Sequence, residues 1–445
     1  MLDRAQEIVS LAVRGGATDA ECVGREGEEF SSTVRLGQVE SLKEAGSRAF
    51  GLRVLIGRRS GSSYTSDFSR EGLEQLVNSA IGLARSTSED PHAGLPEREQ
   101  LGASPGDLKL YEAEAGELGT EQKIALAQRA ERAALDSDPR IVNSEGAAFE
   151  SFWGTRVLAN SRGFAGEYRR STCSLYVVPV ACWEGQMQRD FDYTLAHSSA
   201  GLKPPEQIGR QAAERALRRL GSVKAATRRV PVVFEPRAGR TLLESLFEAV
   251  NGDSVYRHAS FLAGKLGQGV AGPGVTVIDD GLLPGGFGSS PFDDEGVPTR
   301  RTVVIQEGML KNYLLNCYAA RKLGLETTGN CSRSLAGSTG IGPGNLFLQP
   351  GPSSPEEILA SVDEGFYVTE LIGFGVNLVT GDYSRGAAGL WIRNGKPSFP
   401  VHEVTIAGNL ARMFLDIEMI GSDLEFLGAV AAPTVKIREM TVGGI

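Results

Sequence analysis

The order of apolar and polar positions changes period several times along the chain, and each change marks a predicted element. Residues 2–14 carry apolar side chains at helical spacing, which predicts an amphipathic helix that ends at two glycines. From 18 to 66 the pattern changes to short β segments, with Gly37 as a turn and 49–56 as a buried strand. The chain is therefore expected to begin with a helix and continue into a sheet.

Helical spacing returns twice before the middle of the chain. Residues 70–85 predict a helix with Ser69 at its N-cap, and 120–136 predict a longer helix capped by Thr120. The intervening segment is rich in Pro, Glu, Gly and Ser and has no apolar period. This composition predicts a surface linker near 87–118.

The middle of the chain predicts an antiparallel meander followed by a domain boundary. Apolar and polar residues alternate between 141 and 193, and a basic helix is expected at 205–220. The short polar stretch 221–229 is the predicted boundary. It divides the chain into an N-terminal α+β region, 1–225, and a C-terminal β-rich domain, 226–445.

The C-terminal half opens with a predicted strand at 230–234 and a predicted helix at 238–250. Glycine then becomes dense between short apolar runs, which is typical of short strands joined by tight turns. Strands and helices follow one another in runs rather than in a steady βαβ alternation. The fold class is therefore predicted as α+β, with mainly antiparallel sheets flanked by helices.

The charge of the chain bears on whether it binds nucleic acid. The formal net charge of −9 makes nucleic acid an unfavourable partner, because an acidic chain repels phosphate at long range. A basic stretch from Arg210 to Arg229 is interpreted as a solvated helix face that runs into the domain boundary, with a phosphate-binding face as the alternative.

The cysteines and the N-terminus indicate a cytoplasmic protein. The cysteine count is odd, and the spacings between the cysteines fit neither a disulfide framework nor a zinc ribbon. The cysteines are Cys22, Cys173, Cys182, Cys317 and Cys331. Free thiols are typical of a reducing compartment. The first residues lack the basic start and apolar core of a signal peptide, and no apolar run approaches the roughly 18 residues of a membrane helix.

The search for a self-contained active site finds no strong motif. No two of the histidines lie three or four residues apart, so we expect structural or surface roles for His92, His197, His258 and His402. A Ser-His-Asp triad stays open, because its members need not be adjacent in sequence. The glycines of 285–288 lack the Gly-Lys-Ser/Thr ending of a phosphate loop and are interpreted as a flexible loop.

Two groups of polar residues remain as candidates. The carboxylates of 279–280 and 293–295 are suited to Mg²⁺ or Ca²⁺, but we interpret them as solvated turns. A polar run follows an apolar strand and is a candidate peptide-facing surface, formed by Asp382, Tyr383, Ser384 and Arg385. Arg385 is able to hold a peptide carboxylate in a bidentate contact, or to fix a turn.

Several segments of the C-terminal half resemble the PmbA/TldE family, in the family's order. They are GDSVYRHASFLAGKLGQ (252–268), ARKLGLETTG (320–329), GFYVTELIGFGVNLVTGDYSRGAAGLWI (365–392), VTIAGNL (404–410) and AAPTVKIREMTVGG (431–444). The segment 51–67 resembles the family more loosely. The resemblance implies a two-domain PmbA/TldD-type fold.

The resemblance also implies a choice between two branches of the TldD/PmbA superfamily, which has also been called modulator of DNA gyrase. TldD-like members are zinc metalloproteases with His-Glu-x-x-x-His on a helix and a cysteine near the C-terminus, and TldE-like members pair with them. Aligned on Gly252, the motif places Leu243 at the first histidine, Glu244 at the glutamate and Glu248 at the second histidine, and no cysteine follows Cys331. Catalytic zinc needs three protein ligands and a water, so the resemblance implies the metal-free, TldE-like branch.

Three functional hypotheses follow from the sequence. The first is a non-catalytic subunit that joins a zinc-bearing, TldD-like protease subunit to process or degrade peptides, with no cofactor in this chain. The second is an autonomous metal-dependent peptidase with unrecognised ligands such as Glu244 and Glu248. The third is a regulator that binds DNA gyrase. We also expect a homodimer when the partner is absent, because a face built for a similar subunit can pair with itself.

Overall fold

The N-terminal half of the protein is a long, curved sheet. The computed structural model describes residues 1–113, 118–335, 337 and 339–444. The strands of the sheet are β1 (Asp19–Arg35), β2 (Gln38–Ile56), β3 (Arg59–Thr65), β4 (Ile141–Asn160), β5 (Ala165–Trp183), β6 (Gln186–Arg189) and β7 (Asp192–Ala196). They pair in the order β3-β2-β1-β4-β5-β6, with β7 added to β5, and all of these pairs are antiparallel.

The hairpin of β1 and β2 is much longer than the short segments predicted for this region. Its register runs from Asp19↔Leu55 to Arg35↔Gln38 and turns at Leu36 and Gly37, both of which have positive φ. A two-residue turn of this kind matches the twist of the flanking strands, which confirms the turn at Gly37. The prediction of short strands was wrong because residues 38–49 are mostly exposed on both faces and carry no apolar period.

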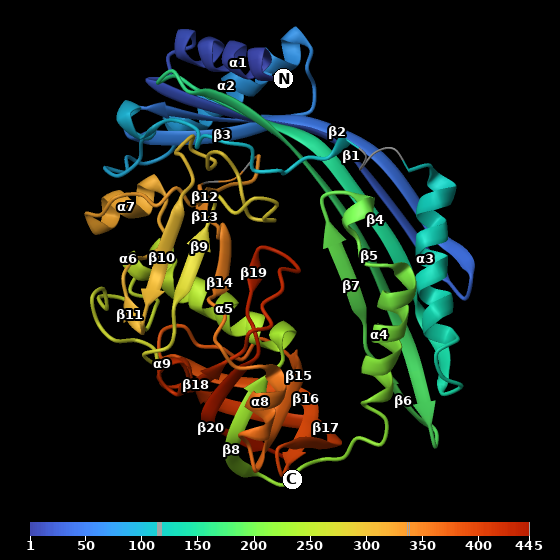
Figure 1. Ribbon diagram of the computed structural model, residues 1–445. Helices are drawn as coiled ribbons and strands as arrows, with labels where there is room; N and C mark the ends of the chain where they lie inside the picture. Colours follow the sequence, from blue (N-terminus) through green and yellow to red (C-terminus); the bar gives the residue numbers. More distant parts are fainter. Residues whose placement is uncertain (114–117, 336, 338, 445) are drawn as a thin grey trace.

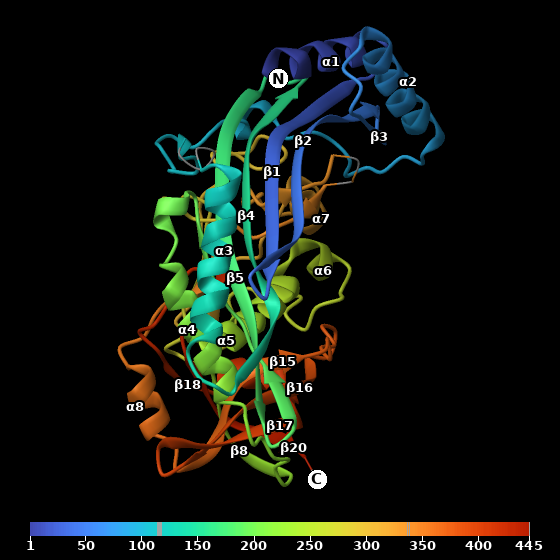
Figure 2. The same cartoon turned by 90° about the vertical axis from the view of Figure 1, so that its right-hand side faces the viewer.

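Helices cover the convex face of this sheet, as Figures 1 and 2 show. Helices α1 (Leu2–Arg14) and α2 (Arg70–Ser86) pack at one end, and α3 (Thr120–Leu135) and α4 (Pro205–Leu217) pack near the other. The Ser69 hydroxyl accepts the Gly72 N–H, so the predicted N-cap is confirmed. Thr120 is not a cap: Gly119 precedes α3, and its N–H donates to the Gln122 side chain.

The C-terminal half lies inside the concave face of the sheet and contains two β layers (Figure 1). The first comprises β9 (Val277–Asp280), β10 (Arg301–Gln306), β11 (Met309–Leu310), β14 (Asn345–Leu348) and β19 (Val430–Ala431). The second comprises β8 (Arg228–Phe234), β15 (Glu364–Ile372), β16 (Asp382–Arg393), β17 (Lys396–Asn409), β18 (Ile417–Ile420) and β20 (Val435–Gly443). Since β20 pairs with both β8 and β17, five of these strands close into a small barrel.

Helix α5 (Pro236–Val250) lies between these two layers and contributes to the largest apolar core. The remaining elements are the pair β12 (Cys331–Ser332) and β13 (Gly340–Ile341), and the helices α6 (Gly252–Tyr256), α7 (Cys317–Leu323), α8 (Pro355–Ala360) and α9 (Leu410–Leu415). The predicted α+β class with mainly antiparallel sheets is confirmed. In the described part of the chain, no helix is both long and apolar enough to cross a membrane.

The predicted linker packs against the C-terminal half rather than lying free on the surface. Leu95 is fully buried, and the Arg321 guanidinium of α7 donates to the carbonyls of His92, Gly94 and Leu95. Residues 114–117 of this predicted segment lie outside the described residues. Gly221–Arg229 carries the chain from α4 to β8, and the domain boundary there stays a prediction.

A buried ion network joins the two halves. Glu21 of β1 is completely buried, and its Oε1 accepts hydrogen bonds of 2.5 Å from Arg53 Nε of β2 and from Arg333 Nη1 of the C-terminal half. Arg53 also lies 3.9 Å from Glu295. Nearby, a Cβ on Gly51 would lie 1.9 Å from the Leu335 carbonyl, so only glycine lets the loop approach β2 this closely.

We expect Glu21→Gln to destabilise the protein by about 3–5 kcal/mol, because it leaves two buried guanidinium groups with one fewer counter-charge. Glu7→Gln is the matched control, since Glu7 pairs with Arg4 in solvent and its loss should change stability by less than about 0.5 kcal/mol. Urea unfolding midpoints of both variants test this. Equal midpoints for the two variants would contradict a structural role for Glu21.

Candidate functional site

Helix α5 contains the three positions that the resemblance aligns with the zinc motif, namely Leu243, Glu244 and Glu248. Pro236 occupies the first helical position, where its missing N–H has no cost. The apolar side chains recur at helical spacing and fill the core between the five-stranded sheet and the barrel, at Leu242, Leu243, Leu246 and Phe247. The sequence folds this segment as a helix because that spacing gives one continuous buried face.

Leu243, Glu244 and Glu248 do not converge on a common point. Leu243 is 2% exposed and lies in the apolar core. Glu244 and Glu248 lie one turn apart on the exposed face, where Glu244 Oε1 is 3.2 Å from Arg240 Nε. Partial burial raises the pKa of Glu248. The helix therefore offers two carboxylates in solvent and an apolar side chain in the core.

These donors do not fit a catalytic zinc ion. Strand β19 packs beside α5, and the segment 426–430 that leads to it contains no cysteine. Across residues 1–113, 118–335, 337 and 339–444, no cluster of three or more His, Cys, Asp or Glu side chains is arranged to hold a metal ion. Two carboxylates without imidazole or thiolate are hard ligands that hold zinc weakly.

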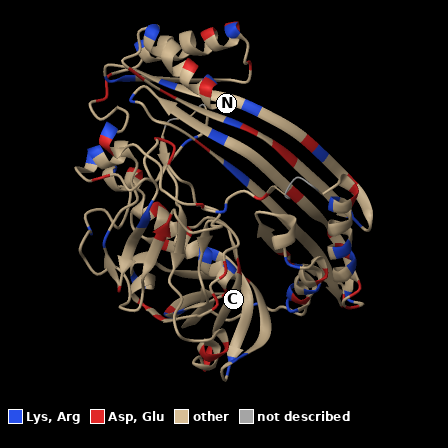
Figure 3. Ribbon diagram, turned by 45° about the horizontal axis from the view of Figure 1, so that its top comes forward, with Lys and Arg blue, Asp and Glu red and all other residues tan. Residues whose placement is uncertain are grey.

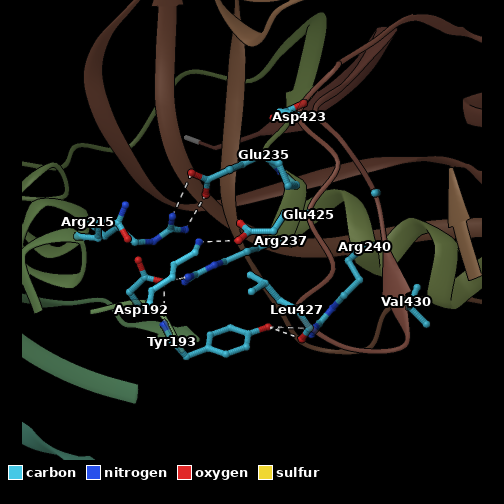
Figure 4. Close-up of a pocket in the computed structure, with 15 residues that line it drawn as sticks. Asp192, Tyr193, Arg215, Glu235, Arg237, Arg240, Asp423, Glu425, Leu427 and Val430 are labelled. Carbon is cyan, nitrogen blue, oxygen red and sulfur yellow. Dashed lines mark hydrogen bonds and ion pairs between the residues drawn. The ribbon is translucent and has the colours of Figure 1, made fainter. Parts of the chain in front are cut away.

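A cavity of about 280 Å³ lies beside the N-terminal half of α5. Figure 4 shows that its walls come from β7, α4, α5 and the segment 423–432. The charged groups that line it are largely paired with one another. Arg237 binds the Asp192 carboxylate and the Phe191 carbonyl, and the Tyr193 hydroxyl donates to the Leu427 carbonyl at 3.1 Å.

The basic helix α4 supplies one wall of this cavity and corrects an expectation. Arg215 and Arg218 both donate to the Glu235 carboxylate, and Arg219 pairs with Asp190 and Glu370. Burial opposes ionisation of Glu235, but the charges and hydrogen bonds of Arg215 and Arg218 outweigh it and lower its pKa. These three arginines fix the end of α4 against the C-terminal half and are not solvated, whereas the other basic residues of the stretch are exposed as predicted, namely Arg210, Lys224, Arg228 and Arg229.

The predicted peptide-facing run does not form one surface. Asp382 to Arg385 opens β16, and successive side chains of a strand point to opposite faces. Asp382 and Ser384 are exposed, whereas Tyr383 is buried, and that burial raises its pKa to about 12. A peptide contact by Asp382, Ser384 or Arg385 stays a prediction.

The acidic clusters were predicted as solvated turns, and the structure shows this to be wrong. Asp279, Asp293 and Glu295 are all less than 5% exposed. Asp293 accepts the N–H groups of Glu295, Val297 and Cys331, and Glu295 accepts that of Cys317. Burial of Asp293 and Glu295 is possible because backbone N–H donors from distant loops replace the water that would otherwise solvate these carboxylates.

Asp279, one of the carboxylates predicted to lie in a solvated turn, is instead buried in a strand. It lies on β9, and its Oδ2 accepts a hydrogen bond of 2.7 Å from the Asn330 side chain. Burial raises its pKa from 3.8 to about 6. The only available signal was its place directly after the apolar run Val275–Ile278, which is typical of a buried strand.

The glycine loop 285–288 packs against the N-terminal half, and its flexibility stays a prediction. The buried His197 ring stacks on Phe287, and its two nitrogens lie 2.6 Å from the Ser171 carbonyl and 3.1 Å from the Gly285 carbonyl. The structural role expected for His197 is therefore confirmed. The loop is held because a residue far away in sequence fills the space beside it.

Comparisons with known proteins agree over the whole chain. Family models match in three consecutive parts: PmbA/TldA metallopeptidase domain 1 over residues 20–84, the central domain over 114–220 and the C-terminal domain over 227–444. Metalloprotease PmbA of Escherichia coli O157:H7 is 37% identical over 442 residues, which cover 99% of this chain and 96% of the relative. The Metalloprotease PmbA homolog of Haemophilus influenzae is 32% identical and covers 98% and 94%.

Solved structures show the same fold. A Bacteroides thetaiotaomicron protein described as a candidate modulator of DNA gyrase superposes with a TM-score of 0.92 at 26% identity, covering 100% of this chain and 98% of that one. TldE from Thermococcus kodakarensis superposes with a TM-score of 0.88 at 22% identity, covering 99% and 100%, which shows a shared fold.

We expect Asp279→Asn to stabilise the protein by up to about 3 kcal/mol above pH 6, and by much less near pH 4. The unfolded carboxyl ionises near pH 3.8 and the folded one near 6, so raising the pH between these values favours the unfolded state. Thermal melts of both proteins from pH 4 to pH 8 measure the difference.

Asp382→Asn is the matched control for this measurement. Asp382 is exposed, and its pKa is lowered by Thr380 and Asn409, so its loss should produce no gain in stability as the pH rises. A stability difference between Asp279→Asn and the unsubstituted protein that stays constant from pH 4 to pH 8 would contradict the raised pKa.

Proposed function

Because the chain belongs to the PmbA/TldD metallopeptidase family, we propose that it is the metal-free, TldE-like subunit of a two-protein peptidase. Its partner is a TldD-like subunit that carries the zinc. The observation that supports this most strongly is Leu243, which stands at the first histidine position of the resemblance and is 2% exposed in the core. A leucine side chain has no donor atom and cannot bind a metal ion.

The rest of α5 supports a structural rather than a catalytic role in this chain. Its apolar face connects the five-stranded sheet to the barrel, so the helix determines how the two β layers pack. Zinc in the partner would supply the activated water for peptide hydrolysis. The residues of this chain would bind and orient the peptide, which is the contribution we assign to its concave surfaces.

The alternative of an autonomous metal-dependent peptidase depends on Glu244 and Glu248. Both are exposed, and Glu244 is already paired with Arg240, so neither forms the closed, water-excluding site that metal-assisted hydrolysis needs. Direct binding to DNA gyrase or DNA gains no support from the basic helix, since Arg215, Arg218 and Arg219 are engaged in ion pairs with the protein's own acids.

We further propose that the complex acts in the cytoplasm and that the chain forms a homodimer when the partner is missing. The cysteines are free thiols in the structure, and burial raises the pKa of Cys22 to about 12 and that of Cys173 to about 11. Thiols with such pKa values stay protonated and inert at neutral pH.

We expect the purified chain to contain no stoichiometric zinc and to cleave no peptide, and the mixture with a TldD-like partner to contain one zinc per heterodimer and to cleave peptides. Elemental analysis and a peptidase assay of each chain alone and of the mixture measure this. In the mixture, Glu244→Gln in this chain should leave activity unchanged, because its carboxylate is not part of the partner's site.

Stoichiometric zinc in this chain alone, or peptidase activity that Glu244→Gln abolishes, would favour the autonomous enzyme. Absence of a complex at micromolar concentrations would exclude the subunit role. Glu71→Gln is the matched control for Glu244→Gln, since Glu71 is an exposed carboxylate in the first turn of α2, away from α5.

A further inference from the structure

The register of the curved sheet brings arginines together on its concave face. Arg25 of β1 and Arg156 of β4 are direct cross-strand partners, and Arg156 is opposite Tyr168 of β5. Arg170 follows Tyr168 by two residues and therefore points to the same face. Figure 3 shows charged residues along these strands, and all four side chains line cavities on the concave side.

Arg25 is in an unfavourable electrostatic position. Like charges directly opposite each other destabilise a sheet. Arg156 is paired with Asp294, and Arg170 donates to the carbonyls of Phe287 and Ser289. Arg25 donates to the Arg333 carbonyl at 3.2 Å, and within the described part of the chain no carboxylate pairs with it. Burial and the charge of Arg156 lower the pKa of Arg25, and the charge of Asp294 offsets this only in part.

An open cavity of about 410 Å³ lies against these guanidinium groups. Its floor is the cross-strand pair Gly27 and Gly154, and a Cβ on either residue would lie 2.8 Å from the Phe152 ring. The ring therefore covers the bare backbone and forms an aromatic platform. Leu335 and Ala49 add apolar surface to the lining.

The cavity continues in both directions along the concave face. It shares Arg156, Tyr168 and Arg170 with a cavity of about 300 Å³, and Glu29 and Phe152 with one of about 480 Å³. Because they share these lining residues, the three cavities adjoin one another, and we call them together the trough. A row of adjoining cavities suits an extended chain segment better than a single small molecule.

One side of the trough is an open sheet edge. Strand β3 pairs with β2 from Phe50 to Ile56 only, and in the described residues no strand pairs with the outer edge of 38–49. Ser47 and Ala49 of this edge border the cavity. Unpaired backbone groups of this kind bind extended peptides by strand addition, with the side chains of the added strand entering neighbouring pockets.

We propose that the trough binds an extended acidic peptide, with a peptide carboxylate held by Arg25 and assisted by Arg156 and Arg170. This deepens the proposed function and rests on it, since it assigns to this chain the part of the complex that holds substrate. A carboxylate matches the planar guanidinium groups and relieves the repulsion between Arg25 and Arg156. Phe152 and Leu335 contact the apolar part of the peptide.

A nucleic acid fits the same groove less well. A single-stranded nucleic acid carries one negative charge on each nucleotide. Glu26 and Glu29 line the cavity beside the arginines and would repel these charges. The net charge of −9 opposes a polyanion as well. A peptide with isolated carboxylates avoids this repulsion.

The test measures binding of a fluorescein-labelled, extended peptide, in which three Glu are separated from one another by neutral residues, to the purified chain by fluorescence anisotropy. The same peptide with Gln in place of Glu is the comparison, and each is measured at low and at physiological ionic strength. We expect the Glu peptide to bind more tightly, and Arg25→Gln to weaken that binding about tenfold. Arg140→Gln, which removes an exposed arginine paired with Asp138, should leave it unchanged.

A charge-reversal variant tests the contact between Arg25 and the peptide carboxylate through a gain of binding as well as a loss. Arg25→Glu should weaken binding of the Glu peptide further and strengthen binding of a matching peptide with three Lys. Equal binding of the Glu and Gln peptides, or equal effects of Arg25→Gln and Arg140→Gln, would overturn the proposal. So would a single-stranded oligonucleotide that binds as tightly as the Glu peptide and loses affinity with Arg25→Gln.

Failure of this proposal is separable from failure of the proposed function. The binding assay uses this chain without a partner, whereas the subunit role is read from zinc content and peptidase activity of the mixture. An active complex with unchanged peptide binding in Arg25→Gln would retain the subunit role and remove the peptide trough.

Discussion

Two guanidinium groups that share one buried carboxylate hold the halves of this protein together. Glu21 contributes from β1, Arg53 from β2 and Arg333 from the C-terminal half. Removal of Glu21 takes away the carboxylate that Arg333 pairs with and leaves Arg53 only the more distant Glu295, so buried positive charge stays without full compensation. The network fixes the distance between the concave sheet and the loops that face it.

The same interface contains more buried acid than its arginines neutralise. Burial raises the pKa of Asp293, and the charge of Glu295 raises it further. Burial also raises the pKa of Glu295, although Arg53 opposes this. Asp293 accepts backbone N–H groups of residues 295, 297 and 331, so it holds these two loops together.

Helix α5 keeps the family fold with an apolar side chain at a position where the resemblance implies a histidine. A zinc helix must turn imidazole groups toward a cavity, whereas α5 turns Leu243 and its neighbours into the core and leaves Glu244 and Glu248 in solvent. The gain in apolar burial favours the packing of the sheet on the barrel.

The sequence by itself determined the helices α1, α2 and α5, the turn at Gly37, the α+β class and the family, because these depend on local spacing or on long matching segments. Only the tertiary structure decided that Asp279, Asp293 and Glu295 are buried, and that Arg25 and Arg156 are opposite each other. Burial of a charge depends on donors from distant segments, and cross-strand neighbours depend on register, and neither leaves a periodic signal in the chain.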